Sequence, residues 1–233
     1  ILPEYTAVEG SSMYLRAGET YTVEELLYGM MLVSGNDAAV ALACHTAGSV
    51  QAFADMMNDK ARALGMTGSA FQNPNGLDAE GHYSTARDMA ALTCAAMAND
   101  TFCTIVATER ATIGGQTLVN HNRLLRCYDG AIGVKTGFTD NARRCLVSAA
   151  ERGGVTLVAV TLNAGDDWND HAKMLDYGFT KVKAYPLETS CTNRVAVAGT
   201  GQSVGVYAQA RTLALTPEQR TSCLLYTSDA ADD

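Results

Sequence analysis

The stretch MMLVSGNDAAVALA, residues 30–43, places serine, glycine, asparagine and aspartate between two apolar runs. Before this break, Leu26, Met30 and Val33 recur at helical spacing and fall on one helix face. Serine and asparagine are typical capping residues, because their side chains satisfy backbone N–H groups at the start of a helix. The stretch therefore predicts two buried helices joined by a short polar turn, whose side chains can face a cleft.

Further helix signals flank this turn, and four helices are predicted in the first hundred residues. Thr22 and Glu25 have the T-x-x-E spacing of a capping box. Gly65 suits the C-terminal cap of one helix, and Ser84 is expected to be the N-terminal cap of another. The predicted ranges are residue 22 to the polar turn, 37–46, 49–65 and 84–98.

After Asp100 the helical period gives way to β-rich runs, which predict strands. These runs are residues 103–113, 116–120, 130–136, 144–150 and 155–164. The last two are joined by the sequence ERGG and predict a hairpin of buried strands. A closing helix over residues 166–179, acidic in its first turn, is expected to lie on the sheet.

A change of pattern near Tyr185 and Pro186 predicts a domain boundary. We expect a main domain over residues 1–183 and the beginning of a small β-rich domain over residues 184–220. Residues 221–233 continue no strand or helix pattern and resemble translated adapter sequence, so a non-native tail is predicted there.

The composition excludes several classes of protein. With 47% hydrophobic and 18% charged residues, the 233-residue chain has the composition of a soluble globular protein. A net charge of −8 argues against nucleic acid as the main partner, and no run of 18 apolar residues predicts a membrane span. The seven cysteines are odd in number and lack C-x-x-C spacing, so neither a zinc site nor a complete disulfide framework is indicated.

Two short motifs could carry chemistry. Ser34-x-Asn36 lies on the polar turn, and Lys135-Thr136-Gly137 lies at the end of a predicted strand. Each alone is weak, since helix capping and a solvated strand end explain them as well. In this order, about a hundred residues apart, they resemble the second and third motifs of the set S-x-x-K, S-D-N and K-T-G, which penicillin-binding proteins and class A β-lactamases share.

Four longer blocks make the resemblance more specific. They are LLYGMMLVSGNDAAVALA, FQNPNGLDAEGHYSTARDMA, GVKTGFTDNARRCLVSAAERGG and NAGDDWNDHAKMLDYGF. Over residues 10–180 the chain resembles the low-molecular-mass penicillin-binding proteins that are serine-type D-alanyl-D-alanine carboxypeptidases. The resemblance implies an α/β (α+β) fold of β-lactamase/transpeptidase type, with an antiparallel sheet, a helical cluster and a following small β domain. No metal or cofactor is implied, since the family's acyl-transfer chemistry uses serine.

The resemblance also implies a catalytic role for the polar turn. Ser34 Oγ would relay a proton to the leaving D-alanine nitrogen, and the Asn36 amide would hold the substrate peptide and the catalytic lysine. Both roles need short side chains on a fixed turn.

On the strand, the family analogy implies substrate-binding roles. Lys135 and Thr136 would supply a cation and a hydroxyl to the free carboxylate of the substrate. Gly137 would leave room for the substrate backbone, and the backbone N–H of Phe138 would be one donor of the oxyanion hole.

The first of the three motifs is missing, because no serine in the chain is followed three positions later by lysine. In the family this serine is the acylated nucleophile. We therefore expect the chain to be a fragment that lacks its nucleophile and is inactive by itself. A natural relative without a nucleophile is the alternative.

Three other positions need interpretation. Relatives commonly carry glycine where this chain has Arg143, and a bulky cation there would lie close to the groove wall. Asp167 and His171 are four residues apart on the closing helix and are interpreted as a surface pair rather than a metal site. His82 lies in a turn and is interpreted as a structural or surface residue.

The sequence thus predicts a serine-type D-Ala-D-Ala carboxypeptidase that acts on peptidoglycan stem peptides and is trapped by β-lactams. Its expected location is extracytoplasmic, in the cell envelope, with membrane contact only through a segment absent from the chain. A β-lactamase-like hydrolase and a non-catalytic cell-wall-binding relative remain as alternatives.

Overall fold

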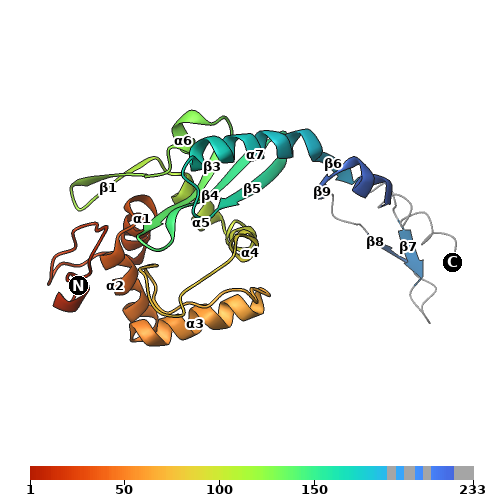
Figure 1. The fold of residues 1–233 in the computed structure, drawn as a ribbon. Coiled ribbons are helices and arrows are strands. Elements are labelled where there is room, and N and C mark those ends of the chain that lie inside the picture. Colours follow the sequence, from red (N-terminus) through yellow and green to blue (C-terminus); the bar gives the residue numbers. More distant parts are fainter. Residues whose placement is uncertain (188–192, 197–202, 207–210, 223–233) are drawn as a thin grey trace. The chain divides into compact units, whose positions relative to one another are not determined.

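The computed structural model describes residues 1–187, 193–196, 203–206 and 211–222 (Figure 1). Residues 1–150 and 157–175 form one compact unit, and residues 151–156 with those described from 176 onward form a second. The predicted boundary between residues 183 and 184 stays a prediction. The predicted non-native tail lies outside the described residues except at positions 221 and 222.

The first unit begins with a cluster of helices that follows the predicted order. Its elements are η1 Pro3–Tyr5, α1 Val23–Val33, α2 Asn36–Ala47, α3 Val50–Ala63, α4 Ala86–Ala96 and α5 Asp100–Ala107. The capping box of α1 is confirmed, because the Thr22 side chain accepts from Glu25 N while the Glu25 side chain accepts from Thr22 N. The predicted cap Ser84 is wrong. Thr85 caps α4, and the Ser84 hydroxyl instead lies 2.7 Å from Ser69 Oγ.

The prediction of a strand over residues 103–113 is wrong in its first half, which belongs to α5. Asn99 caps this helix by accepting from Phe102 N at 3.0 Å. Ile105 and Val106 are buried, and Val106 packs against the sheet. A cap and a buried face thus outweigh the β propensity of this segment.

The strands that lie wholly or mainly in the first unit form a hairpin and a three-stranded sheet. The remaining elements are β1 Arg110–Ile113, β2 Gln116–Val119, α6 Leu124–Cys127, β3 Ala131–Thr139, β4 Arg143–Arg152, β5 Val155–Thr161 and α7 Asp167–Lys181. β1 pairs with β2, and the sheet order is β3-β4-β5, with Lys135 opposite Val147 in the antiparallel β3–β4 ladder. The predicted antiparallel sheet and its β4–β5 hairpin are confirmed.

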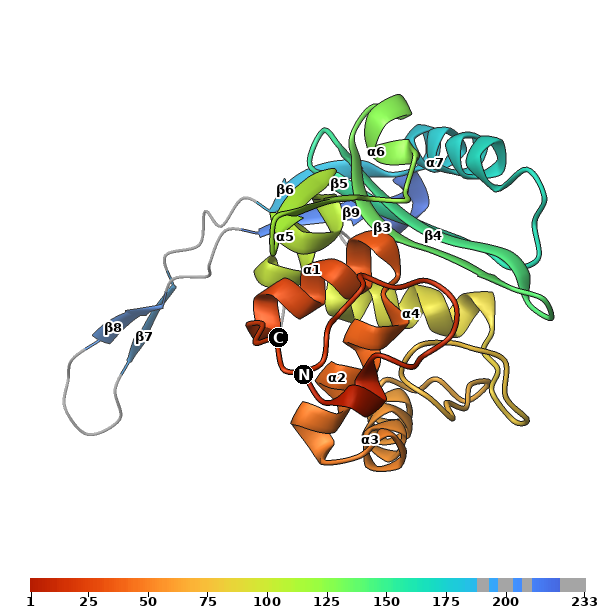
Figure 2. The same cartoon turned by 90° about the vertical axis from the view of Figure 1, so that its left-hand side faces the viewer.

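Helices cover both faces of this sheet (Figures 1 and 2). α7 contacts one face through His171, whose ring nitrogens lie 2.5 Å from Ser148 Oγ and 3.0 Å from Thr161 Oγ1. The predicted closing helix on the sheet is therefore confirmed. On the other face, α5 approaches so closely that a Cβ at Gly133 would lie 2.8 Å from Val106 Cγ2.

The segment before α1 is fastened to the junction of α1 and α2 by the carboxylate of Asp37, which is 1% exposed. It accepts hydrogen bonds from Ser12 Oγ at 2.6 Å, Met13 N at 3.1 Å, Leu15 N at 3.0 Å and Ala38 N at 3.0 Å. Four donors satisfy a charge that would otherwise be costly to bury. Asp37 therefore fixes where the polar turn lies.

The second unit contains two antiparallel strand pairs. β6 Lys183–Leu187 pairs with β9 Arg211–Leu215, and β7 Asn193–Ala196 pairs with β8 Ser203–Val206. Across the described residues of both units, no single helix has the length and apolarity needed to cross a membrane. α4 and α5 meet that test only as a pair, and they are bent by 112°.

We predict that Asp37→Asn lowers the free energy of unfolding by about 2–4 kcal/mol, because an amide cannot accept from all four donors and leaves buried groups unsatisfied. Urea denaturation measures this loss. The matched control is Asp55→Asn on α3, an exposed carboxylate that, among the described residues, accepts from Gln51 Nε2 alone. A loss for Asp37→Asn as small as that of the control would contradict the role assigned to the carboxylate.

Candidate active site

The polar turn between α1 and α2 places Ser34 in a left-handed backbone conformation, with φ 58° and ψ 37°. This conformation costs a non-glycine residue about 1–2 kcal/mol, so the surrounding contacts must hold it. Gly35 N donates to Gly29 O at 3.1 Å, and a Cβ at Gly35 would lie 3.0 Å from Asp37 Oδ1 and 3.2 Å from Met13 N. Close packing around the turn therefore fixes the position of the Ser34 hydroxyl.

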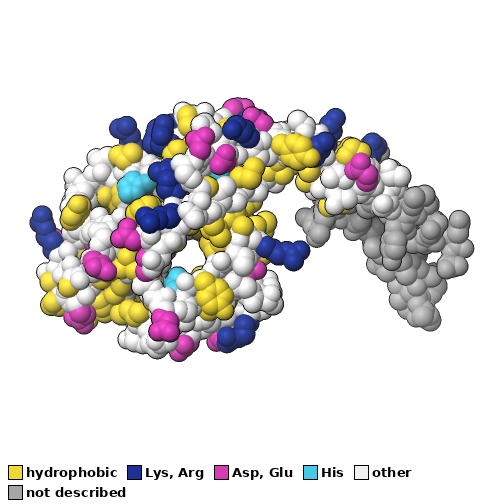
Figure 3. Space-filling model, viewed as in Figure 1, with side chains coloured by type: hydrophobic (Ala, Val, Ile, Leu, Met, Phe, Trp, Pro, Cys, Tyr) yellow, Lys and Arg dark blue, Asp and Glu magenta, His cyan; other side chains and the backbone are white. Residues whose placement is uncertain are grey.

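Lys135 joins the two predicted motifs. Its Nζ donates to Ser34 Oγ, 101 positions away in the sequence, and to Thr136 O at 2.7 Å. Burial lowers the pKa of Lys135 from 10.5 to about 8. A lysine with this pKa is mostly a cation at neutral pH and can still release a proton, so it can bind an anion and exchange protons with the serine. In the view of Figure 3, the surface is hollowed between the helices and the sheet.

Asn36 lies beside this pair at the start of α2 and is 7% exposed. Its Nδ2 donates to Glu9 O at 2.8 Å, so one of the two amide N–H groups is used within the protein. In the described part of the chain, no hydrogen bond to Asn36 Oδ1 is present. The predicted role in holding the substrate and the lysine stays a prediction, and the side-chain oxygen is available to accept from the lysine.

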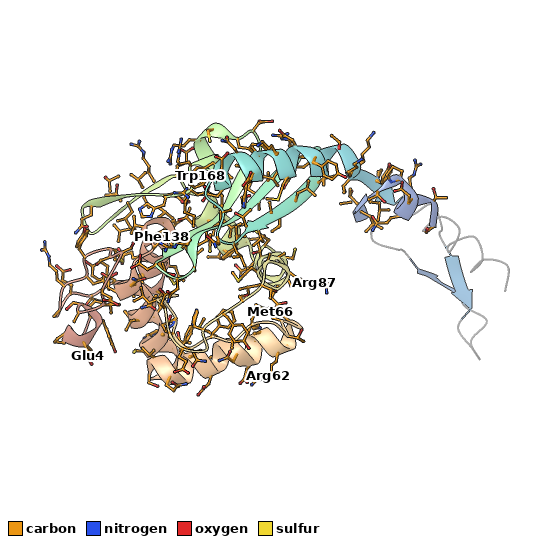
Figure 4. All side chains as sticks on the ribbon, in the orientation of Figure 1. Glu4, Arg62, Met66, Arg87, Phe138 and Trp168 are labelled. Atoms are coloured by element: carbon orange, nitrogen blue, oxygen red, sulfur yellow. The ribbon has the colours of Figure 1, made fainter. Side chains whose placement is uncertain are left out.

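Thr136, Gly137 and Phe138 follow Lys135 along β3, which among the described strands pairs with β4 alone and leaves its other edge open. Gly137 has no positive φ, and a Cβ there would lie 3.7 Å from Cys145 Cβ, an ordinary contact. Neither conformation nor packing thus requires this glycine. Phe138 is 65% exposed at the end of the strand (Figure 4). The roles predicted for these three residues stay predictions.

His121 is a residue of the site that the sequence analysis missed. Its backbone N–H donates to Leu32 O at 3.0 Å, at the end of α1 beside the polar turn. Burial, and then the charge of Lys135, lower the pKa of the His121 imidazole. A histidine in the sequence NHNRLL carries no periodic or motif signal, so only the fold reveals it.

The other candidate residues lie outside the site. His82 Nδ1 accepts from Gln72 N at 3.0 Å and its ring packs edge-on against Phe71, a structural role. The interpretation of Asp167 and His171 as a surface pair is wrong, because both are buried, 3% and 0% exposed. Burial lowers the pKa of His171 to about 4, so its imidazole is neutral between the two hydroxyls that it contacts.

Asp167 instead pairs with Arg144 at the start of β4, with 2.7 Å between Oδ1 and Nη2. The guanidinium of Arg144 lies 5.8 Å from the centroid of the Trp168 ring, which Arg123 also approaches at 5.8 Å (Figure 4). These contacts attach the beginning of α7 to the sheet.

Arg143 has a positive φ of 59°. Glycine is favoured in this conformation, so the backbone itself accounts for the glycine expected at this position. The exposed arginine side chain has no hydrogen bond or ion pair within the described residues.

Residues 3–166 match the family model described as D-alanyl-D-alanine carboxypeptidase. The chain is 39% identical over 186 residues to DacF, a D-alanyl-D-alanine carboxypeptidase of Bacillus subtilis, a match of 76% of this chain and 48% of that protein. It is 40% identical over 186 residues to DacB2, another D-alanyl-D-alanine carboxypeptidase, from Mycobacterium tuberculosis. This match covers 75% of this chain and 64% of that protein. The chain thus spans about half to two thirds of the length of these curated relatives.

Solved structures show the same fold. The D-alanyl-D-alanine carboxypeptidase DacD from Francisella tularensis superposes with a TM-score of 0.76 at 28% identity, over 92% of this chain and 68% of that one. A serine-to-alanine mutant of the Streptomyces K15 DD-transpeptidase superposes with a TM-score of 0.74 at 37% identity, over 77% of this chain and 78% of that one. The transpeptidase-type fold predicted from the sequence is therefore confirmed.

We predict that the free energy of unfolding rises by up to about 3 kcal/mol between pH 8 and pH 10.5, owing to Lys135. Because the pKa of Lys135 is lower in the folded state, the unfolded chain binds more protons across this window, and raising the pH favours folding. Below pH 8 the lysine is protonated in both states and its full burial penalty applies. Denaturant unfolding as a function of pH, with Lys135→Met as the reference, measures the difference. Parallel curves for the two proteins would contradict the prediction.

We predict that Arg143→Gly raises the free energy of unfolding by about 1 kcal/mol, since glycine adopts a positive φ without strain. Arg143→Ala is the matched control, because alanine removes the same cation and keeps the strained backbone. Equal stabilisation by both substitutions would show that charge, and not conformation, is responsible. Thermal unfolding distinguishes the two.

Proposed function

The chain belongs to the D-alanyl-D-alanine carboxypeptidase family, and from this premise we propose that the whole protein removes the terminal D-alanine from peptidoglycan stem peptides through an acyl-enzyme. The observation that carries the proposal is the hydrogen bond from Lys135 Nζ to Ser34 Oγ. It brings the S-x-N turn and the K-T-G strand into one site, the arrangement that acyl transfer with these motifs requires.

The open edge of β3 suits the end of an extended peptide. Such a peptide adds to a sheet edge through main-chain hydrogen bonds, and its terminal carboxylate would meet the Lys135 cation and the Thr136 hydroxyl. Gly137, which packing does not require, would leave room for the peptide backbone. The Phe138 N–H would then stabilise the oxyanion of the scissile carbonyl.

The direction of the Lys135–Ser34 hydrogen bond suggests how the proton moves. Because Lys135 Nζ donates to Ser34 Oγ, the hydroxyl proton of Ser34 can point away from the lysine and into the groove. There it can pass to the nitrogen of the leaving D-alanine while Lys135 returns a proton to the serine. A lysine pKa of about 8 matches this exchange near neutral pH.

The same site would accept β-lactams, whose carboxylate and acyl carbonyl mimic the peptide end. Stem peptides and β-lactams are thus the proposed partners. Because the proposed substrate belongs to the cell wall, we place the whole protein outside the cytoplasm, in the cell envelope.

We predict that Lys135→Ala, in the protein produced from its complete gene, lowers kcat/KM for a peptide ending in D-Ala-D-Ala by at least about 100-fold. Ser34→Ala should lower kcat by about 100-fold while KM changes little, because a proton relay acts in the transition state. Release of D-alanine and labelling by a fluorescent penicillin measure both effects. Lys173→Ala, which removes an exposed lysine of α7, is the matched control.

Full penicillin labelling of the Lys135→Ala protein would contradict the proposed site. Turnover of β-lactams faster than of peptides would favour a β-lactamase-like hydrolase instead. Ser34 is proposed as a relay and not as the nucleophile, so the 233-residue chain should stay unlabelled. A penicillin adduct on Ser34 would overturn that assignment.

A further inference from the structure

The loop between α3 and α4 is organised by its own hydrogen bonds. Asn73 Nδ2 donates to Leu77 O at 2.9 Å, and Asn73 Oδ1 accepts from Gly76 N at 2.7 Å. At its ends, Gln72 N donates to His82 Nδ1 at 3.0 Å. These hydrogen bonds give residues 72–82 a defined conformation, and with it a defined position for the side chain of Asp78.

This loop approaches the S-x-N turn at one point and contacts the β3–β4 hairpin at another. A Cβ at Gly10 would lie 2.8 Å from Asn36 Nδ2 and 3.8 Å from Leu77 Cδ2, so Leu77 lies close to the S-x-N turn. The next residue, Asp78, accepts from Thr139 Oγ1 at 2.7 Å and from Asn141 N at 3.2 Å, at the tip of the β3–β4 hairpin. The loop thus reaches from the neighbourhood of the S-x-N turn to the tip of the β3–β4 hairpin.

The contact of Asp78 with the hairpin is built from several bonds. Both carboxylate oxygens are engaged, and Thr139 Oγ1 also accepts from Ala142 N at 2.9 Å. Hydrogen bonds to an ionised acceptor are stronger than neutral ones. We call the hydrogen bonds of Asp78 to Thr139 and Asn141 the Asp78 clamp. Thr139 directly follows Phe138, so the clamp lies one residue from the proposed oxyanion donor.

We propose that Asp78 is a positioning residue, which holds the end of β3 at the distance from the S-x-N turn that acyl transfer requires. The inference rests on the proposed carboxypeptidase function. β3 pairs with a single strand among those described, so its last residues have support from β4 on one side only. The Asp78 clamp supplies support from the other wall and keeps the Phe138 N–H aimed at the scissile carbonyl.

Two substitutions remove the clamp from opposite sides. Asp78→Asn keeps the shape of the side chain but removes its charge and replaces one acceptor oxygen by an NH2 group. Thr139→Val removes the hydroxyl that donates to Asp78. Thr139→Ser keeps that hydroxyl and serves as the rescue. Glu80→Gln removes a charge from the same loop, where Glu80 is exposed and has no hydrogen bond in the described structure.

In the protein from the complete gene, Asp78→Asn and Thr139→Val should each lower kcat about tenfold with KM changed less than about threefold, since misplacement of a transition-state donor affects mainly kcat. The double substitution should lower kcat by less than the product of the two single effects, because both substitutions affect the hydrogen bond between Thr139 and Asp78. Thr139→Ser should recover kcat, and Glu80→Gln should leave it unchanged. In the 233-residue chain, amide exchange at Asn141 and Ala142 should accelerate in the two clamp variants only.

Unchanged amide exchange in Asp78→Asn would overturn the clamp. Faster exchange with unchanged kcat would overturn the positioning role, as would additive losses in the double variant or an equal loss in Glu80→Gln. If the unsubstituted protein turned over no D-Ala-D-Ala peptide, the proposed function would fail and the positioning role with it, whereas the exchange measurement would still decide whether the clamp exists.

Discussion

The hydrogen bond between Lys135 and Ser34 connects the helical cluster to the sheet, and the rest of the first unit is arranged so that these two atoms meet. Ser34 must adopt a left-handed conformation, which the close packing around Gly35 enforces. The turn must also stay in place, and the four hydrogen bonds to Asp37 hold it against the segment before α1. On the opposite side, α5 supports β3 at Gly133, so that Lys135 projects from a strand with a fixed position.

The electrostatics of the site follow from the same geometry. Within a chain of net charge −8, the fold buries the cation of Lys135 against a neutral hydroxyl and a carbonyl oxygen, which lowers its pKa to about 8. A bound carboxylate would compensate that charge and favour the protonated lysine. Without a ligand, the protein is thus less stable toward unfolding than it would be with an apolar residue at position 135. A bound anion would recover part of this free energy. His121 adds a second group whose protonation is disfavoured beside Lys135.

The elements that could be predicted from the sequence are those specified by local signals. The capping box at Thr22 and the polar turn at Ser34 depend on neighbouring residues, and both helices formed where expected. Residues 103–107 were assigned to a strand from their β-branched side chains, because the sequence did not show that the Asn99 cap and the packing of Val106 against the sheet would together favour a helix. The motif residues Ser34 and Lys135 were recognisable by type and spacing. Asp37, Asp78 and His121 were not, because each acts through partners that only the tertiary fold brings close.

Glycines show how structure separates requirements that look alike in sequence. At Gly29 a Cβ would overlap Met13 Sδ, so the buried methionine would have to shift, and at Gly133, where φ is 151°, a Cβ would lie 2.8 Å from Val106 Cγ2. At Gly137 neither packing nor φ imposes such a limit. The absence of a side chain there is best explained by what approaches the open edge of β3 from outside. Arg143 is the converse case, where the positive φ of the backbone favours glycine and the chain carries a long side chain. The protein therefore tolerates the arginine at a modest loss of stability, whereas a side chain at position 137 would spare the fold and, in the binding mode that we propose, obstruct the peptide.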